Sequence, residues 1–206
     1  MRVGVFGGTF DPVHTGHLIL AEQAREQARL DEVWFIPAFR PPQKPEQTIT
    51  RFDLRVEMLA LALAGNPAFR INELEKERAG PSYTVDTLAE LRRRHPGTSF
   101  ALLLGGDALA DLPSWRDPRG IVTDAALVVM VRPGVALLDA AQLRQRLALP
   151  ADTPLELQVM ETPLIDIASR DLRHRVAVGR SVRYLVPRAV EVYIQEKKLY
   201  RATPEG

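Results

Sequence analysis

The 206-residue sequence contains no cysteine, which excludes disulfide bonds and thiolate chemistry and is typical of a cytoplasmic protein. It also lacks a long hydrophobic run. The longest, AALVVMV at 125–131, has the length of a strand and falls far short of the roughly 18 residues that a membrane-spanning helix needs. Glycines and Asp11 interrupt the N-terminal stretch too early for a signal peptide. We therefore expect a cytoplasmic protein with no membrane partner.

The sequence also has little excess charge, because 27 Lys and Arg face 26 Asp and Glu for a net charge of +1. This balance argues against a surface that binds nucleic acid as a whole. Six arginines follow Ser169, up to Arg188, but no interleaved aromatic platform for bases accompanies them. We predict no nucleic-acid partner. The apolar fraction of 46% and the length are those of a globular chain with one core.

Short runs of Val, Leu, Ile and Phe alternate with amphipathic stretches along the chain. Strands are predicted at 1–6, 32–37, 69–74, 99–107, 125–134 and 155–161. Helices are predicted at about 18–28, 51–64, 84–94, 169–178 and 187–197. Apolar strands between helices indicate a parallel sheet covered on both faces, which is a doubly wound α/β fold. We predict a single domain over 1–200 that includes a C-terminal helical segment, 167–200, and a tail at 201–206.

The predicted strands are each followed by segments with glycine, proline or polar residues. In doubly wound sheets, ligands bind beyond the carboxyl ends of the strands, where the strand order reverses. Four such segments are therefore expected at one rim of the sheet: 7–17, 37–44, 105–107 and 132–134. The loop at 38–50, which is rich in proline, is the candidate lid.

Residues 5–17 read VFGGTFDPVHTGH and follow the first predicted strand. Gly7 and Gly8 are expected to allow a sharp turn and a close approach of a ligand, and the next helix would direct its N-terminus there. His14 and His17 lie in or beside the first helical turn, with Thr15 as a possible N-cap. The spacing is neither the dinucleotide fingerprint nor the P-loop. Taken alone, the two histidines are better explained by a helix cap and a surface position than by phosphate binding, and four histidines without cysteine make a metal site a weaker alternative.

The pattern G-G-T-F-D-P-x-H-x-G-H resembles the (T/H)xGH motif of the nucleotidyltransferase superfamily, which transfers AMP or CMP from a nucleoside triphosphate to a phosphate. Further stretches, GPSYTVDTL at 80–88, LLLGGDALADLPSW at 102–115 and the C-terminal segment, resemble bacterial nicotinate-nucleotide adenylyltransferase. The resemblance implies a Rossmann-like nucleotidyltransferase fold. It also implies transfer of AMP from ATP to nicotinate mononucleotide, giving nicotinate adenine dinucleotide and pyrophosphate in NAD biosynthesis.

The resemblance implies roles for a set of site residues. His14 and His17 would be catalytic, with His17 at the α-phosphate and His14 at the triphosphate. The residues that would bind ATP are Gly7, Gly8, Thr9, Phe10, Gly105, Asp107, Arg132, Ser169 and Arg173. Those that would bind nicotinate mononucleotide are Lys44, Tyr83, Thr84 and Trp115. Mg²⁺ is expected as the cofactor, bound through substrate phosphates and water.

Structural explanations compete with several of these assignments. Asp107 would serve equally as a helix cap, Trp115 as core packing, and Lys44 or Arg132 as solvated surface side chains. The sequence also departs from the family motif I-S-S-T-x-x-R, because Ala168 and Arg170 replace the usual Ser and Thr. The departure removes two hydroxyls that would otherwise donate to a phosphate.

Two other functions fit the same sequence. The first is an adenylyltransferase for another phosphate acceptor, such as nicotinamide mononucleotide or phosphopantetheine. The second is a nucleotide-binding sensor without catalysis, against which the intact His14 and His17 argue. The sequence leaves the oligomeric state open. A cation, Arg116, follows Trp115 and would favour an acidic over an amide ligand in the neighbouring pocket.

Overall fold

One sheet of six parallel strands organises the molecule. The computed structural model describes residues 1–42, 49–131 and 138–201. The strands lie in the order β3-β2-β1-β4-β5-β6, and their bounds are β1 (Arg2–Gly8), β2 (Glu32–Pro37), β3 (Phe69–Ile71), β4 (Ser99–Gly105), β5 (Ala126–Val131) and β6 (Leu157–Glu161). The chain runs outward from β1 in one direction and from β4 in the other. The predicted doubly wound α/β fold is confirmed, and its strand order reverses between β1 and β4.

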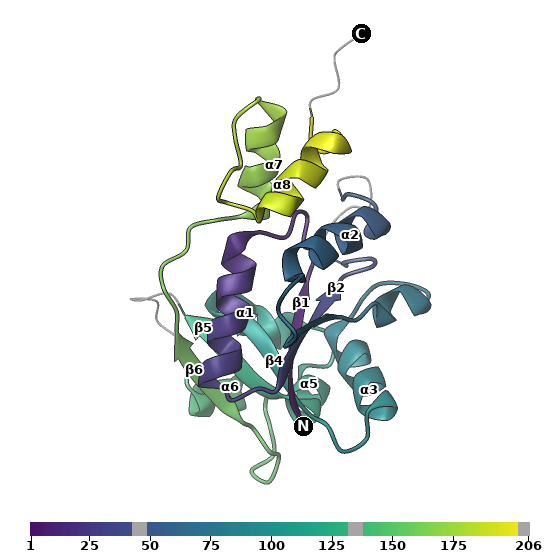
Figure 1. Ribbon diagram of the computed structural model, residues 1–206. Helices are drawn as coiled ribbons and strands as arrows, with labels where there is room; N and C mark the ends of the chain where they lie inside the picture. The colour runs from purple at the N-terminus through teal and green to yellow at the C-terminus, as the bar shows by residue number, and fades with distance from the viewer. Residues whose placement is uncertain (43–48, 132–137, 202–206) are drawn as a thin grey trace.

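Helices cover both faces of the sheet (Figure 1). Their bounds are α1 (Thr15–Gln27), α2 (Phe52–Leu63), α3 (Thr84–Arg94), α4 (Gly106–Asp111), α5 (Pro118–Asp124), α6 (Ala140–Arg146), α7 (Ser169–Ala177) and α8 (Arg188–Glu196), with 3₁₀ turns η2 (Leu74–Glu77) and η3 (Leu112–Ser114). Helices α1, α2, α7 and α8 contribute to one core, and α3 to α6 contribute to the other. Within the described ranges we find no helix with the length and hydropathy that a membrane crossing requires.

Alternation of side chains along the strands builds these two cores. In β2, Val33 and Phe35 enter the core under α1 and α2, whereas Trp34 and Ile36 enter the core under α3 and α5. Both sets are apolar because a parallel sheet with helices on each side has no face in contact with water. This is why the strands read in the sequence as continuous apolar runs rather than as alternating patterns.

The first strand is longer than predicted. It continues through Gly8, which pairs with Pro37 of β2, so Gly7 and Gly8 do not form the turn. The turn lies in the residues that follow, where Phe10 has a φ of 49°. A Cβ on Gly8 would lie 2.9 Å from the Phe10 ring. The glycine therefore makes room for a buried aromatic side chain.

Other predicted boundaries also change. The strand predicted at 69–74 ends at Ile71, because Asn72 Oδ1 accepts a hydrogen bond from the Leu74 amide at 3.1 Å and begins the turn into η2. Gly106 and Asp107 belong to α4 rather than to the preceding strand. Three short helices, α4, α5 and α6, were not predicted, since six or seven residues are too few for a clear helical period.

Arg55 ties together the segments at the carboxyl ends of β1 and β2. It projects from α2, is only 1% exposed, and its guanidinium donates to three backbone carbonyls, those of Thr9 at 2.7 Å, Ala38 at 2.9 Å and Thr50 at 2.8 Å. Buried carbonyls without a donor are costly, so one planar fork of donors stabilises three loops at once.

We expect Arg55→Ala to lower the free energy of unfolding by at least about 3 kcal/mol, because it leaves buried carbonyls without a donor and opens a cavity. The measurement is urea denaturation followed by circular dichroism. Arg51→Ala is the matched control, since Arg51 directly precedes the same helix but is exposed and pairs with Asp53 on the surface. Equal stability losses in the two variants would contradict the anchoring role.

Candidate active site

The loop between β1 and α1 is held from several sides. Asp11 is 2% exposed, and its carboxylate accepts from the Tyr200 hydroxyl at 2.7 Å and from the Thr50 amide at 3.1 Å. Arg173 Nη1 donates to the Asp11 carbonyl at 2.7 Å, and Ser169 Oγ donates to the Pro12 carbonyl at 2.9 Å. Hydrogen bonds from the C-terminal helical segment thus hold the loop that carries the two histidines. Burial and the nearby Asp11 carboxylate raise the pKa of Tyr200, which keeps its hydroxyl a donor.

His14 and His17 stand together at the start of α1. Their rings are stacked with centroids 3.6 Å apart, and the backbone amide of His14 donates to His17 Nδ1 at 3.2 Å. The prediction of Thr15 as N-cap is wrong, because His14 occupies that position. Thr15 instead faces the C-terminal segment, where its amide donates to the Leu185 carbonyl at 2.9 Å and its hydroxyl donates to the Tyr184 carbonyl at 3.3 Å. The prediction that His17 lies in the first turn is confirmed.

The burial of this pair decides its charge. His14 is 6% exposed, and loss of hydration lowers its pKa to about 4. Burial also lowers the pKa of His17, and the charge that His14 would carry lowers it further. Both rings are therefore neutral at pH 7. Because His17 Nδ1 accepts from an amide, the His17 proton resides on Nε2, which makes Nε2–H the one N–H donor of this ring.

A first cavity, of about 200 Å³, opens beside His14 at the strand reversal. Gly105 lines it from the end of β4, and Gly106 and Asp107 line it from the start of α4. Asp107 is the only carboxylate among the described residues of its wall. The rest is mostly apolar and includes Phe6, Leu20, Met130, Ile165 and Ile167. The structure thus brings His14, Gly105 and Asp107 together, as predicted from their positions after β1 and β4.

A second cavity, of about 380 Å³, lies on the other side of the same loop. Its lining residues are Gly8, Thr9, Ala38, Pro41, Pro42, Ser82, Tyr83, Thr84, Ser114, Trp115, Arg116 and Ile121. Paired hydrogen bonds between Arg40 and Ser82 join the two chain segments of its wall, at 2.9 and 3.1 Å. Trp115 Nε1 is buried and has no hydrogen-bond partner in the described part of the chain. Because this atom is buried, it does not present a donor to the cavity.

The two cavities lie on either side of the β1–α1 loop. Gly8 and Thr9 border the second cavity, whereas His14 and Gly16 border the first. His14 lines the first cavity, and His17, which stacks on it, lines neither. Two ligands bound in the cavities would approach each other across the loop near the N-terminus of α1, where partial positive charge favours anions. The geometry is therefore suited to a reaction between two phosphorylated molecules.

The other predicted residues fall into three groups. Phe10 is 2% exposed and packs against Phe6 and Phe35, so only its backbone is available to a ligand. Ser169 and Arg173 hold the loop carbonyls, and their contact with ATP stays a prediction. Lys44 and Arg132 lie outside the described residues, as does part of the candidate lid at 38–50.

Sequence reasoning missed Asp11, Arg55 and Tyr200, which position the site without lining either cavity. A signal was present for Arg55, because a charged residue stands among the apolar side chains of a helical face that also holds Met58 and Leu59. Tyr200 offered none, since its partner Asp11 is 189 positions away.

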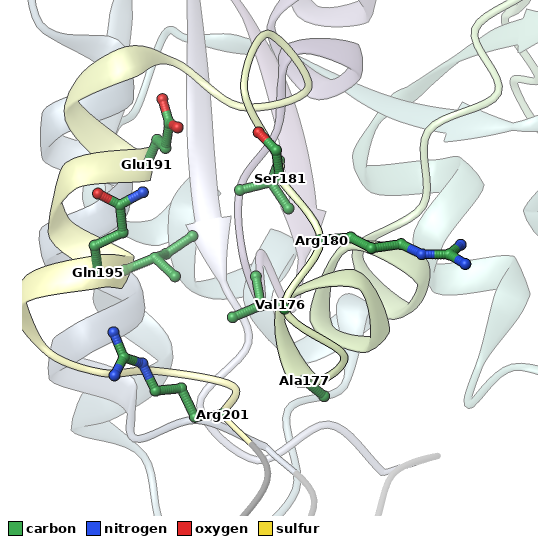
Figure 2. Close-up of a pocket in the computed structure, with 10 residues that line it drawn as sticks. Val176, Ala177, Arg180, Ser181, Glu191, Gln195 and Arg201 are labelled. Atoms are coloured by element: carbon green, nitrogen blue, oxygen red, sulfur yellow. The ribbon is translucent and has the colours of Figure 1, made fainter.

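A third cavity, of about 510 Å³, lies between α7 and α8 and is lined by none of the predicted site residues. Figure 2 shows Glu191 and Gln195 on α8 facing Ser181 and Val176, with Arg180 directed away. The Glu191 carboxylate is already paired with Arg188 at 2.6 Å. This cavity is separate from the histidine pair.

The lowered pKa values of the imidazoles predict an acid-sensitive fold. As the pH falls from 6.5 toward 4, the unfolded chain takes up protons on both histidines before the folded chain does, so the free energy of unfolding falls. For His14 alone the loss should approach about 3 kcal/mol at pH 4. Urea denaturation across this range, compared with a His14→Gln/His17→Gln variant, isolates the contribution. Identical pH profiles would contradict it.

Comparison with known proteins identifies the family of this chain. Residues 5–175 match the family model described as cytidylyltransferase-like. A probable nicotinate-nucleotide adenylyltransferase of Thermomicrobium roseum is 46% identical over 200 residues, covering 97% of this chain and 92% of the relative. A protein of the same description from Thermus thermophilus is 44% identical over 201 residues, covering 98% of this chain and 100% of the relative.

Among solved structures, the fold is similar to Plasmodium falciparum nicotinic acid mononucleotide adenylyltransferase complexed with NaAD. The TM-score is 0.78, the identity is 18%, and 97% of each chain is covered. At this identity the likeness concerns the fold, whereas the full-length sequence matches concern the family. The chain belongs to the nicotinate-nucleotide adenylyltransferases, within the cytidylyltransferase-like nucleotidyltransferases.

Proposed function

We propose that this enzyme transfers the AMP moiety of ATP to nicotinate mononucleotide in NAD biosynthesis. The observation that carries the proposal is the pair of cavities on either side of the β1–α1 loop, one bordered by His14 and Asp107 and the other by Trp115 and Tyr83. The names of the relatives, which match over nearly the full length, support the same reaction. The lack of cysteine favours a cytoplasmic location.

The reaction needs no general base. The acceptor phosphate has a second pKa near 6, so its oxygen is already a dianionic nucleophile at neutral pH. This oxygen forms a bond to the α-phosphorus of ATP while the bond from that phosphorus to the bridging oxygen breaks. Pyrophosphate leaves with the electron pair. The protein must align two anions and stabilise the charge that develops on the α-phosphate and the leaving group.

Neutral imidazoles suit that task as fixed donors. His17 would donate its Nε2 proton to an α-phosphate oxygen, and its orientation is set by the bond from the His14 amide to Nδ1. His14, stacked on it and lining the first cavity, would contact the triphosphate. The donors are already in place before the substrate binds, so little reorganisation accompanies the reaction.

The two nucleotides would occupy the two cavities. On the ATP side, Asp107 would accept from ribose hydroxyls beside the two glycines at the junction of β4 and α4. On the other side, Trp115 would stack on the pyridine ring, while Tyr83 and the N-terminus of α3 at Thr84 would face its carboxylate. Arg173 would use its remaining N–H groups toward the triphosphate while one of them holds the Asp11 carbonyl.

We also propose Mg²⁺ as the cofactor. The described residues contain no group of three or more His, Asp or Glu side chains arranged to hold a metal ion. Asp107 is the single carboxylate on the described wall of the first cavity, so the ion would depend mainly on phosphate oxygens and water. Such an ion would neutralise charge on the triphosphate. The protein residues would continue to position the α-phosphate.

An acceptor series tests the function. With ATP and Mg²⁺, we expect pyrophosphate release with nicotinate mononucleotide, weaker release with nicotinamide mononucleotide and none with phosphopantetheine. Chelation of Mg²⁺ with EDTA should abolish release, and added Mg²⁺ should restore it. Preference for another acceptor would overturn the substrate assignment, and ATP binding without release under any condition would indicate a sensor.

Substitution of His17 tests its role. We expect His17→Ala to lower kcat by roughly 10²- to 10³-fold, the effect of losing one prearranged donor to a developing oxyanion. The thermal transition should show that the protein remains folded. His174→Ala is the matched control, because His174 is an exposed side chain on α7, whereas His17 stacks on His14 beside the first cavity. A kcat near the original value in His17→Ala would refute the role.

A further inference from the structure

We infer that the Arg116 side chain determines the preference of this enzyme for an acidic over an amide pyridine nucleotide. The inference rests on the proposed function and names a residue that sets its specificity. Among the described residues that line the second cavity, Arg116 is the single charged residue. The other wall residues are apolar, aromatic, small or hydroxyl-bearing.

The guanidinium of Arg116 is held at the cavity by an aromatic ring. Its Cζ lies 4.6 Å from the centroid of Tyr83, which is a cation–π contact. No carboxylate of a described residue forms an ion pair with it, and that of its neighbour Asp117 accepts from the Gly120 amide at the start of α5. Arg116 therefore keeps its charge and its N–H donors available to a ligand.

A second positive feature converges on the same wall. Tyr83 is the N-cap of α3, an eleven-residue helix whose first residue, Thr84, lines the cavity. The first amides of a helix lack partners within it and favour negative charge. Tyr83 thus belongs to both features, since its backbone caps the helix and its ring contacts the guanidinium. Trp115 provides an aromatic residue beside them.

This arrangement separates two ligands of nearly equal shape. A nicotinate carboxylate accepts hydrogen bonds at both oxygens and carries the charge that a guanidinium complements. A nicotinamide group carries no charge, and the N–H donors of its NH₂ group would face the N–H donors of the protein. Backbone amides alone would still satisfy one oxygen of either ligand. The charge of Arg116 is what distinguishes them.

The test compares kcat/KM for nicotinate mononucleotide and nicotinamide mononucleotide in the original protein and in Arg116→Gln. We expect kcat/KM for the acid to fall roughly 10- to 100-fold, mostly through KM, with a change below about 3-fold for the amide. Arg116→Lys, which keeps the charge without the planar fork, should retain part of the preference. Arg93→Gln removes an exposed charge from α3 far along the helix and should leave both values unchanged.

The dependence of the acid-to-amide ratio on ionic strength distinguishes an electrostatic role of Arg116 from a merely structural one. Raising the ionic strength should reduce the acid-to-amide ratio in the original protein and leave it constant in Arg116→Gln. Two results would overturn the inference if the original protein is active: an equal loss of kcat/KM for both acceptors in Arg116→Gln, or an acid-to-amide ratio of kcat/KM that this substitution leaves unchanged. If the original protein used neither acceptor, the proposed function itself would fail.

Discussion

The buried backbone groups of the β1–α1 loop need hydrogen-bond partners, and the rest of this site depends on that constraint. The loop turns through Phe10 in a left-handed conformation and is buried, so water cannot complete its hydrogen bonds. Arg55 donates to the Thr9 carbonyl, Arg173 to the Asp11 carbonyl and Ser169 to the Pro12 carbonyl. Donors from α2 and α7 thus substitute for water. A loop held in this way presents its histidines in one orientation.

Burial of the histidines follows from that anchorage and gives them their chemical character. Neutral rings cannot act as cations toward phosphate, but they donate in fixed directions, and the stacking of His14 on His17 restricts both. Positive charge enters the site from other sources, such as the N-terminus of α1 on one side and Arg116 on the other. The imidazoles therefore supply donors at fixed positions, and other groups supply the positive charge. This division suits a transfer between two anions.

How far the sequence predicted the structure depended on the length of each pattern. The helices at α2 and α3 were predicted to within one residue, because their apolar periods extend over three turns. Helices α5 and α6 were missed, although each begins with a capping aspartate, Asp117 or Asp139, which accepts from an amide in the first turn. Attention to those caps would have predicted them.

Sequence alone determined the alternation of strands and helices, the parallel sheet and the motif with its two histidines, because these depend on local pattern and on short spacings. Tertiary structure alone decided that Tyr200 bonds to Asp11, 189 positions away, and that Arg173 bonds to the same residue across 162 positions. It also decided that Arg116 lies over Tyr83. Contacts of this kind depend on how separate elements pack, and no periodicity within either segment records its partner.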